Sequence, residues 1–521
     1  MLCKVFCACC SGLDAVIITI EADVDKGISF YLVGLPDSAV KESQQRISTA
    51  LNHYGFRIPG KRIVINMVPA NIRKEGSAFD IAIAIGILCA SGQISSETIS
   101  QERLGKFLIM GELALDGTLR SFCGALPIAI KAAREGFEGC IFPREAAIEC
   151  SELGGIPIYA ATNIKDVLEI LESDELGSRH LVANIKGNST PKECKERTYE
   201  YDFAQVKGQQ SARLALEIAA AGCHNIILSG APGCGKTLMA KCLPSIMPPL
   251  TLDQSMETSQ IYSVSGLLQS MGGFMKEAPF RTPHHTTTVT AFAGGGHSSL
   301  PGEISLAHNG ILFMDEFCEF PRHVIESLRQ PMEDGTIQIS RVKSKYLYPA
   351  NFMLVATMNP CPCGYYGSST HHCTCSTAAI MKYASRISGP ILDRIDLHVT
   401  VNPVDPASLI NIGDDHIQSE PSQAIAARVV QARNIQYARY RNERFAVNSH
   451  IPASKLEYYC NIGHREKSYI RGIVAKLGLS ARSYSKLLKI SRTIADLDGK
   501  DFISLEHISK ALQYRSTTAD Y

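Results

Sequence analysis

The chain has 521 residues, of which 45% are hydrophobic and 20% are charged, and its formal net charge is +1. Its length allows about three domains, each with its own core. The balanced charge excludes a uniformly basic surface, so a polyanion would have to bind a local patch. The 18 cysteines are spread over a long chain, which excludes the short, disulfide-rich secreted class and favours a reducing, cytoplasmic environment.

The N-terminus and the apolar runs favour a protein without a membrane segment. The first residues, MLCKVFCACCSGLDA, turn polar too early for a signal peptide. The longest apolar run, residues 79–92, is shorter than the roughly 20 residues that span a bilayer. We therefore expect a cytoplasmic protein with no membrane partner.

Residues 1–172 are predicted to form an α+β domain. Apolar residues alternate, or recur every three to four positions, as strands and helices require. The expected strands are residues 15–24, 28–35 and 62–68, the expected helices are residues 38–55 and 77–90, and a hairpin is expected at residues 106–120. This hairpin turns at Asp116 and Gly117, a pair typical of tight turns.

The remainder is predicted to contain a linker, a core and a helical end. Residues 173–202 are polar and lack apolar periodicity, which is typical of a linker. In residues 203–403 strand-like and helical patterns alternate, which predicts a parallel α/β sheet. Residues 404–521 are predicted to form a helical lid. Its expected helices are residues 421–443, 452–460, 465–476, 480–496 and 504–513. The predicted fold class is therefore multidomain α/β.

A phosphate-binding loop is the most specific motif in the chain. A short buried strand runs into Gly-x-x-x-x-Gly-Lys-Thr within residues 225–243, and a helix follows. This is the context in which a P-loop folds, with backbone amides around the β-phosphate, Lys236 at the β/γ oxygens and the Thr237 hydroxyl at Mg²⁺. The predicted nucleotide-binding residues are Gly230, Gly233, Cys234, Gly235, Lys236, Thr237 and Leu238. ATP and Mg²⁺ are the expected cofactors.

Three polar residues follow two other predicted strands of the same sheet. In GILFMDEF an apolar strand ends in Asp315, expected to hold Mg²⁺, and Glu316, expected to polarise the attacking water. In FMLVATMNP the strand ends at Asn359, whose amide can orient that water. Ligands of parallel sheets bind at the carboxyl edge, so these residues are expected to meet at the P-loop.

Two arginines near the end of the chain are candidates for a catalytic role. Arg394 lies between two aspartates in SGPILDRIDLHV, and Arg482 opens a predicted lid helix. Arg394 is interpreted either as a local Arg–Asp surface pair or as an arginine finger acting across a subunit boundary.

The order of these motifs resembles the AAA+ ATPases. Several stretches, among them DFAQVKGQQSARLALEIAAAGCHNIILSGAPGCGKT, FRTPHH, PGEISLAHNGILFMDEF and SRISGPILDRIDLHV, resemble the YifB/ComM family of magnesium-chelatase-like ATPases over nearly the whole chain. The resemblance implies a homo-oligomeric ring, a hexamer, with ATP between subunits. It also implies catalytic roles for Lys236, Glu316 and Asn359 in one subunit, with Arg394 as the finger in trans and Arg482 as a second sensor on the lid.

The first domain is similar to the proteolytic domain of Lon, in which a serine pairs with a downstream lysine. Alignment of KEGSAFD with the serine motif places Ala78 at the nucleophile and Leu126 at the lysine. A serine–lysine mechanism needs a neutral amine beside a hydroxyl, so we expect no protease. Ser77, one residue away, would need a loop shift to act. The domain is interpreted as a scaffold or a nucleic-acid platform.

Two insertions in the core are predicted to form hairpins. One breaks at the three glycines 294–296, and the other lies in DGTIQISRVKSKYLYPANF. On the second, Arg341, Lys343 and Lys345 alternate and so share one face, beside two tyrosines. Cations with aromatic residues suit single-stranded DNA, and a solvated strand face is the alternative interpretation.

A second basic cluster lies on a predicted lid helix. It comprises Arg428, Arg433, Arg439, Arg441 and Arg444. We interpret this cluster as a solvated helix face.

The resemblance implies DNA translocation, because ComM-like members promote branch migration during natural transformation. We expect a DNA-stimulated helicase or translocase that acts on single-stranded or branched DNA. The alternatives are a magnesium-chelatase-type motor and an ATPase that remodels proteins.

Four cysteines follow Asn359 in a glycine- and serine-rich stretch. Cys361, Cys363, Cys373 and Cys375 form two Cys-x-Cys pairs, and His371 or His372 can replace one thiolate. Four such ligands suit a structural Zn²⁺. Reduced loop thiols and a redox switch are the alternatives.

Overall fold

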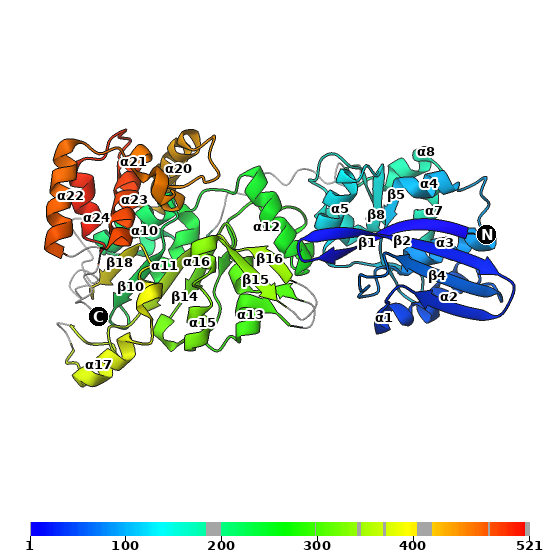
Figure 1. Ribbon diagram of the computed structural model, residues 1–521, viewed down its shortest axis with the longest axis horizontal. Coiled ribbons are helices and arrows are strands. Elements are labelled where there is room, and N and C mark those ends of the chain that lie inside the picture. Colours follow the sequence, from blue (N-terminus) through cyan, green and yellow to red (C-terminus); the bar gives the residue numbers. More distant parts are fainter. Residues whose placement is uncertain are drawn as a thin grey trace. The chain divides into compact units, whose positions relative to one another are not determined.

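The computed structural model describes residues 2–183, 199–296, 299–340, 345–367, 371–403, 419–477 and 480–515. The chain forms two compact units (Figure 1). Unit 1 comprises Met1–Glu196 and Leu252–Met275, and unit 2 comprises Arg197–Thr251 and Lys276–Tyr521. The predicted fold class is confirmed, with a parallel sheet in the core and a helical C-terminal region. Within the described ranges, no helix has both the length and the apolar character needed to cross a bilayer.

Unit 1 is built on a seven-stranded sheet in the order β3-β4-β2-β1-β5-β8-β9. The strands are β1 (Leu2–Ser11), β2 (Asp14–Asp25), β3 (Ser29–Val33), β4 (Arg62–Val68), β5 (Phe107–Ile109), β8 (Gly139–Pro143) and β9 (Ile158–Ala161). The β1–β2 and β2–β4 pairs are antiparallel, and the remaining pairs are parallel. Both strands predicted within residues 15–35 are present, and β3 pairs with β4.

The strand β1 was missed by the sequence analysis. It forms a long hairpin with β2, in register from Leu2 opposite Asp23 to Ser11 opposite Asp14. Cys3 and Cys7 alternate with Val5 on its buried face. A thiol packs as a small apolar side chain, so these cysteines complete the two-residue period of a strand.

Helices cover the sheet of unit 1. They are α1 (Ser38–Lys41), α2 (Ser43–His53), α3 (Asp80–Ser91), α4 (Gln101–Lys106), α5 (Ala125–Arg134), α6 (Arg144–Glu149), α7 (Ile164–Glu172) and α8 (Asp174–Gly177). The apolar helix α3, predicted from residue 77, is buried almost throughout and packs on β1 and β2 (Figure 1). A Cβ at Gly86 would lie 3.1 Å from that of Ala22 in β2. The absence of a side chain therefore permits this close approach.

The predicted hairpin at residues 106–120 is divided in the structure. Its first residues form β5 of the large sheet, and its end forms the small antiparallel pair β6 (Glu112–Leu113) and β7 (Leu119–Arg120). The predicted turn at Gly117 is present, with a φ of 79°.

The compact units do not follow the boundaries expected from the sequence. The start of the predicted linker 173–202 folds as α8 and the 3₁₀ turn η1 (Ser178–His180), and Val182 is buried. Residues 184–198 lie outside the described residues. The helix α12 (Leu252–Val264), from the middle of the predicted core, packs on α5 of unit 1. Ser263 accepts a hydrogen bond from the Gly124 N–H through its carbonyl oxygen at 3.0 Å.

Unit 1 buries an acidic side chain at the end of α6. Glu149 is 1% exposed, and its Oε1 accepts a hydrogen bond from the Leu126 N–H at 3.3 Å. Its Oε2 is buried without a hydrogen-bond partner in the part of the chain that the structure describes. Burial raises the pKa of this carboxyl to about 7, because the charged form loses its hydration.

Unit 2 contains a five-stranded parallel sheet in the order β11-β14-β17-β10-β18. The strands are β10 (Ile226–Gly230), β11 (Phe280–Arg281), β14 (Ile311–Met314), β17 (Met353–Met358) and β18 (Leu397–Val401). The flanking elements of the core are α10 (Gln210–Gly222), α11 (Lys236–Cys242), α13 (Val289–Ala293), α14 (Glu303–Leu306), α15 (Arg322–Glu326), α16 (Pro331–Asp334), α17 (Thr377–Ala384) and α18 (Gly389–Leu392). The central strands are buried on both faces, as in other parallel sheets.

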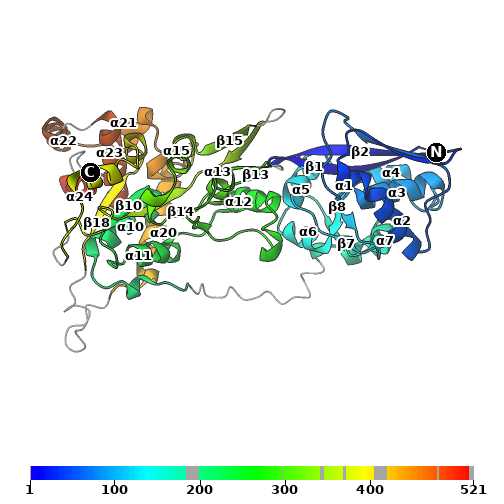
Figure 2. The ribbon, with the colours of Figure 1, turned by 90° about the horizontal axis from the view of Figure 1, so that it is seen from below.

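Both predicted hairpins of the core are present. Gly294–Gly295 (β12) pairs with Leu300–Pro301 (β13), and Thr336–Ser340 (β15) pairs with Lys345–Pro349 (β16). The two hairpins contact each other, and Tyr348 donates a hydrogen bond to the Ser299 carbonyl at 2.9 Å. Figure 2 shows β15 on the outside of the core, beside β13 and α13.

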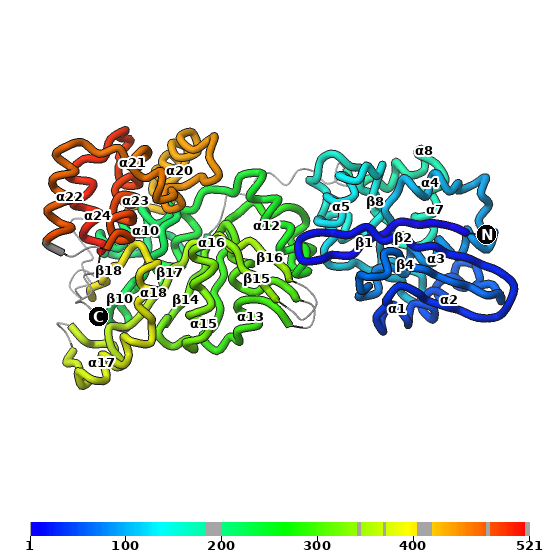
Figure 3. Tube along the Cα trace, viewed as in Figure 1, coloured from blue at the N-terminus to red at the C-terminus, as the bar shows by residue number. Residues whose placement is uncertain are grey.

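The predicted helical end is also present. Its helices are α20 (Ser422–Arg439), α21 (Leu456–Tyr459), α22 (His464–Leu477), α23 (Ala481–Leu497) and α24 (Leu505–Leu512). The helix α10 packs against β18, α20 and α23 (Figure 3), so it connects the lid to the sheet. Residues 404–418, at the start of the predicted lid, lie outside the described residues.

Replacement of Glu149 by Gln should stabilise unit 1 at alkaline pH. The folded-state pKa lies above its ordinary value, so the folded state binds the proton more tightly. The free energy of unfolding therefore falls as the pH rises from about 4.5 to 7. Glu149→Gln should remove this loss, up to about 3 kcal/mol at pH 8.

Hydrogen exchange of α5 and β8 in urea, at pH 5 and pH 8, measures this effect. The exposed Glu145 on the same helix provides the control Glu145→Gln. If wild type and Glu149→Gln were equally protected from hydrogen exchange at pH 8, burial of the ionised carboxylate would not destabilise unit 1.

Candidate nucleotide-binding and catalytic site

The P-loop connects β10, which lies between β17 and β18, to α11. A side chain at Gly230 would collide with the carbonyl oxygen of Val401 in the adjacent β18. Gly233 and Gly235 have φ values of 78° and 91°, in the left-handed region that glycine adopts without strain. These conformations turn the backbone of the loop around the N-terminus of α11. Cys234 is buried in this loop, and Leu238 packs against the hydrophobic core.

The ammonium group of Lys236 lies among neutral oxygen atoms. It is 2.6 Å from the Gly230 carbonyl, 2.9 Å from the Ala231 carbonyl and 3.3 Å from Asn359 Oδ1. Lys236 is 9% exposed. A buried cation held by neutral groups fits an anionic ligand, because a phosphate would supply the opposite charge. The structure thus brings Asn359 of β17's carboxyl end to the P-loop lysine, as predicted.

The predicted acid pair lies beside the P-loop threonine. Thr237 Oγ1 donates a hydrogen bond to Asp315, at 3.1 Å from Oδ2 and 3.4 Å from Oδ1. A hydroxyl and a carboxylate at this separation are the oxygen ligands that Mg²⁺ prefers. Glu316 follows and is exposed. Lys236, Thr237, Asp315 and Asn359 therefore converge at one edge of the sheet.

Thr357 holds the acid pair in place and was missed by the sequence analysis. It is 1% exposed, and its hydroxyl donates to Asp315 Oδ1. The Thr357 hydroxyl oxygen also accepts a hydrogen bond from the Glu316 N–H at 3.1 Å. Glu316 has a φ of 53°, a conformation that costs about 1–3 kcal/mol for a residue other than glycine. The Thr357 hydroxyl thus stabilises both the metal-binding carboxylate and a strained backbone.

The two late arginines meet at a residue that the sequence analysis did not identify. Glu333, on α16, accepts a hydrogen bond from Arg394 and lies 3.6 Å from the guanidinium of Arg482. Arg394 also donates to the Pro390 carbonyl at 2.8 Å, and its side chain is 16% exposed. The local pair with flanking aspartates is thus not the contact observed. Asp396 instead interacts with Lys486 and His224.

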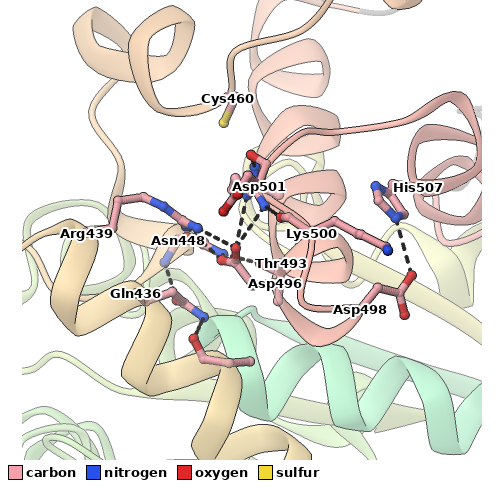
Figure 4. Close-up of polar contacts among 12 residues, drawn as sticks. Gln436, Arg439, Asn448, Cys460, Thr493, Asp496, Asp498, Lys500, Asp501 and His507 are labelled. Atoms are coloured by element: carbon pink, nitrogen blue, oxygen red, sulfur yellow. Dashed lines mark hydrogen bonds and ion pairs between the residues drawn. The ribbon is translucent and has the colours of Figure 1, made fainter.

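Buried polar contacts hold the lid helix α23 (Figure 4). Asp496 accepts hydrogen bonds from Arg439 at 2.5 and 2.8 Å, from Arg492 at 3.1 Å and from Asn448 at 2.8 Å. Thr493 lies beside it and contacts Asn448 at 3.0 Å. These contacts fix the position of the helix whose first turn carries the second candidate arginine.

The network continues to the turn that carries Arg394. His224 Nε2 is 2.8 Å from Thr493 Oγ1, and its Nδ1 is 3.3 Å from Asp396 Oδ2. Burial alone would raise the pKa of Asp396, but the Lys486 ammonium and the His224 ring hold it well below its usual range. The carboxylate is therefore charged, and it connects the lid to the residues preceding β18.

The arginine cluster predicted to be solvated, three of whose members lie on α20, is largely paired, which corrects the interpretation from sequence. Arg433 is 5% exposed and donates to the Ala220 carbonyl at 2.8 Å. Arg428 binds Glu217 at 2.6 and 2.9 Å. With Arg439 on Asp496, three of the five arginines bind partners far away in the sequence.

The four predicted cysteines form a compact cluster. Their sulfur atoms all lie within 4.8 Å of one another. The Sγ of Cys361 is 3.3 Å from that of Cys363 and 3.7 Å from that of Cys373. The sulfur of Cys375 completes the set. His371 does not belong to this group of sulfur atoms, and its ring stacks on Tyr365 at a centroid distance of 4.8 Å.

The cysteine cluster contacts the P-loop. A Cβ added to Gly364 would lie 2.6 Å from the Pro232 ring, so the backbone of this loop rests on the P-loop. The Gly364 N–H donates to the Cys361 carbonyl at 2.9 Å. The Tyr366 N–H donates to the Cys361 sulfur at 3.3 Å. The loop that carries the first two cysteines therefore packs directly against the P-loop.

The basic hairpin is described in part. Lys345 begins β16, opposite Ser340, and is exposed. Arg341 and Lys343 lie outside the described residues. Of the three candidate DNA-binding residues, the structure therefore describes only Lys345, at the start of the second hairpin strand.

The positions aligned with the Lon serine and lysine are used for packing. Leu126 is fully buried in α5, and the Ala78 carbonyl accepts a hydrogen bond from the Gly111 N–H at 2.8 Å. Ser77 donates to Glu112. The serine hydroxyl is therefore bound to a carboxylate rather than to an amine.

A P-loop follows β10, an asparagine follows the adjacent strand β17, an acid pair follows the next strand β14, and a helical lid is present. Together these features define an AAA+ P-loop protein. Family models match three stretches of the chain. Residues 202–409 match magnesium chelatase, subunit ChlI; residues 20–146 match subunit ChlI of Mg-chelatase; and residues 419–515 match the ChlI C-terminal model.

Relatives that align over nearly their full length show to which family of AAA+ proteins the chain belongs. The chain is 41% identical to competence protein ComM of Haemophilus influenzae over 508 residues, 97% of this chain and 96% of that protein. It is 36% identical to YifB of Escherichia coli over 506 residues, 97% and 95% of the two chains. The chain belongs to this ComM and YifB family of magnesium-chelatase-like AAA+ ATPases. The magnesium-chelatase 67 kDa subunit of Heliobacterium mobile is 27% identical over only 30% of this chain and 28% of its own.

Replacement of Thr357 by Val should slow ATP hydrolysis about tenfold. Valine has the same shape, but it removes the hydroxyl that donates to Asp315 and leaves the Glu316 N–H with Asp315 Oδ1, at 3.2 Å, as its acceptor. A hydrogen bond to a charged group contributes about 1.5–3 kcal/mol, and a factor of ten in rate corresponds to about 1.4 kcal/mol. We expect a lower kcat and a weaker apparent Mg²⁺ affinity.

Steady-state ATP hydrolysis at several Mg²⁺ concentrations measures both quantities. Thr357→Ser keeps the hydroxyl and should restore activity. If Thr357→Val were as active as wild type, the Thr357 hydroxyl would have no role in ATP hydrolysis.

Proposed function

We propose that this protein is an ATP-hydrolysing ring motor that moves along DNA, with ATP bound between neighbouring subunits. The observation that carries the proposal is the convergence of Lys236, Thr237, Asp315 and Asn359 at one sheet edge. Arg394 and Arg482 lie in the same unit as this sheet. The four converging residues support ATP as the energy source, and Arg394 is proposed to act on the ATP bound by a neighbouring subunit.

The residues at the sheet edge would act as follows. Lys236 would bind the β- and γ-phosphates, and Thr237 with Asp315 would hold Mg²⁺. The bound Mg²⁺ would neutralise charge on the phosphate oxygens. Glu316 would orient and polarise the attacking water, and Asn359 would hold it near the γ-phosphate. The oxygen atoms described above fit this metal, since a carboxylate and a hydroxyl already face each other.

Arg394 and Arg482 would complete the site between subunits. Arg394 would reach the nucleotide of the next subunit, while Arg482 would act from the lid. In the single chain both guanidinium groups contact Glu333. Ring assembly would therefore have to exchange a carboxylate partner for a phosphate, which carries more charge.

A mixing experiment tests the shared site. Lys236→Ala and Arg394→Ala should each abolish ATP hydrolysis. In an equimolar mixture, about a quarter of the interfaces of a head-to-tail ring would pair an intact lysine with an intact arginine. We expect activity to return to about this fraction, measured as phosphate release.

Glu333→Gln separates two explanations for Arg394. If Arg394 only stabilised the fold through Glu333, this variant would lose activity as well. We expect it to remain active. A mixture as inactive as its components would contradict a site made by two subunits.

DNA is proposed as the substrate on two grounds. A full-length relative that is 41% identical to this chain is named a competence protein, and Arg341, Lys343 and Lys345 alternate in a sequence that predicts one basic face. Of this set the structure describes Lys345, which is exposed, and Tyr346, which is half-buried, whereas Tyr348 is buried in the core. Cations with an accessible aromatic ring suit a single strand and its phosphates. Branch migration in recombination or natural transformation, by a hexamer in the cytoplasm, is the activity we propose. The cations would follow the backbone of the strand.

Branched DNA tests this proposal. Wild type with ATP should convert a forked or four-way junction into products, and Lys236→Ala should not. Combined replacement of Arg341, Lys343 and Lys345 by Ala should weaken DNA binding about tenfold and leave basal hydrolysis unchanged. Gel separation of the strands and filter binding measure these effects.

The exposed lysine on α17, Lys382, provides a control for the single replacement Lys345→Ala, because each variant loses one positive charge. Lys382→Ala should not change DNA binding. ATP hydrolysis stimulated by an unfolded polypeptide and indifferent to DNA would instead indicate a protein-remodelling motor. Support of magnesium insertion into a porphyrin would indicate a chelatase-type motor.

Unit 1 is proposed to be a platform without protease activity. Leu126 packs in the core where a lysine would be needed, and Ser77 binds Glu112. A serine beside a carboxylate lacks the neutral amine that would accept its proton. Its long β1–β2 hairpin offers a scaffold for other contacts.

The cysteine cluster is proposed to hold a structural Zn²⁺. A tetrahedral site with Zn–S bonds of about 2.3 Å places its sulfur atoms about 3.8 Å apart. The sulfur atoms of Cys361, Cys363 and Cys373 lie 3.3–3.7 Å apart. The four thiolates therefore fit zinc closely, without a histidine ligand.

A further inference from the structure

We propose that metal binding at the cysteine cluster and nucleotide binding at the P-loop are thermodynamically linked, each strengthening the other. The cluster comprises Cys361, Cys363, Cys373 and Cys375. The inference rests on the proposed zinc and ATP sites and is independent of the proposed DNA substrate. It assigns a regulatory role to zinc beyond stabilising a loop.

The first link between the two sites is through the backbone. Asn359 follows β17 and contacts Lys236 at 3.3 Å, and one proline separates it from Cys361. Cys361 is fully buried. A metal held by this sulfur would therefore fix the chain two residues from the amide that faces the P-loop lysine.

The second link is a packing contact. Gly364 lies between the two cysteine pairs, and its backbone rests on the Pro232 ring of the P-loop. The position has a φ of 84°, which glycine adopts without strain. Two hydrogen bonds, from the N–H groups of Gly364 and Tyr366 to Cys361, hold this turn. Any shift of the turn would move the wall of the nucleotide site.

The third link is the span of chain that the metal would close. The second cysteine pair immediately precedes Ser376, which caps α17 by accepting a hydrogen bond from the Ala379 N–H at 3.3 Å. Zinc would join the end of β17 to the start of this helix. Without a cation, the four thiols make no bond that holds the loop closed, and closing it costs conformational entropy.

Linkage follows from these three contacts. Zinc would favour the arrangement in which Asn359 and Pro232 occupy their places at the nucleotide site. A ligand that selects one arrangement raises the affinity for any other ligand that selects it. The two affinities must change by the same factor, and such factors are typically about fivefold or more.

Two titrations of the full-length protein test the linkage. The zinc dissociation constant is measured by competition with a chromogenic chelator, with and without a slowly hydrolysed ATP analogue and Mg²⁺. The nucleotide dissociation constant is measured with a fluorescent ADP analogue, for zinc-loaded and zinc-stripped protein. Both should tighten by the same factor, about fivefold or more.

Variants distinguish the contact from the metal site. Pro232→Ala keeps all four thiols and removes the ring that Gly364 touches, so zinc should bind equally well without nucleotide while the linkage factor falls towards one. Cys123→Ser, at an exposed thiol of unit 1, should change neither quantity.

The outcomes separate the proposals. Purified protein that binds no stoichiometric zinc would overturn both the zinc site and the linkage. Stoichiometric zinc with the same affinity in the presence and absence of nucleotide would overturn the linkage alone. No DNA enters either titration, so failure of the DNA proposal leaves this result unaffected.

Discussion

The parallel pairing of β14, β17, β10 and β18 is the constraint on which the site depends. In register, Met314 lies opposite Ala356, and Ser229 lies opposite both Met358 and Thr400. Because all four strands run the same way, the residues that follow them emerge at one edge. The P-loop, the acid pair and the asparagine need no further element to meet. Only the exact placement of the acid pair requires an additional group, the hydroxyl supplied from within β17.

The lid is coupled to the opposite, amino-terminal edge of this sheet by buried polar contacts as well as by apolar packing. A chain of contacts runs from Asp496 through Asn448, Thr493 and His224 to Asp396, with each group buried or nearly so. Buried polar groups are costly unless they are paired. A lid displaced from the sheet would leave several of them without partners. The helix carrying Arg482 and the turn carrying Arg394 are therefore expected to move together.

The sequence predicted the fold class, the two core hairpins and most helices, because these depend on local periodicity and turn chemistry. It also placed the residues that converge at the P-loop, since their motifs follow apolar strands. It did not reveal Thr357 or Glu333, because one hydroxyl in an apolar strand and one acid in a short helix resemble many others. The arginines of α20 were predicted to be solvated because partners such as Glu217, about 200 residues away in the chain, cannot be recognised from local sequence. The strand β1 was not predicted because two of its buried positions are cysteines, Cys3 and Cys7, which do not stand out as apolar residues.

The packing of α12 with unit 1 has a consequence for dissection of the molecule. Unit 1 draws on two separate stretches of the chain, and the second is inserted in the ATPase unit between β10 and β11. Genetic removal of residues 1–196 would strip α12 of its cover and expose Ile261 and Tyr262, which are now buried. Neither terminal fragment is thus an autonomous module. Any tension or rotation generated during the nucleotide cycle would pass into unit 1 through both ends of this insertion, as well as through the chain that follows residue 196.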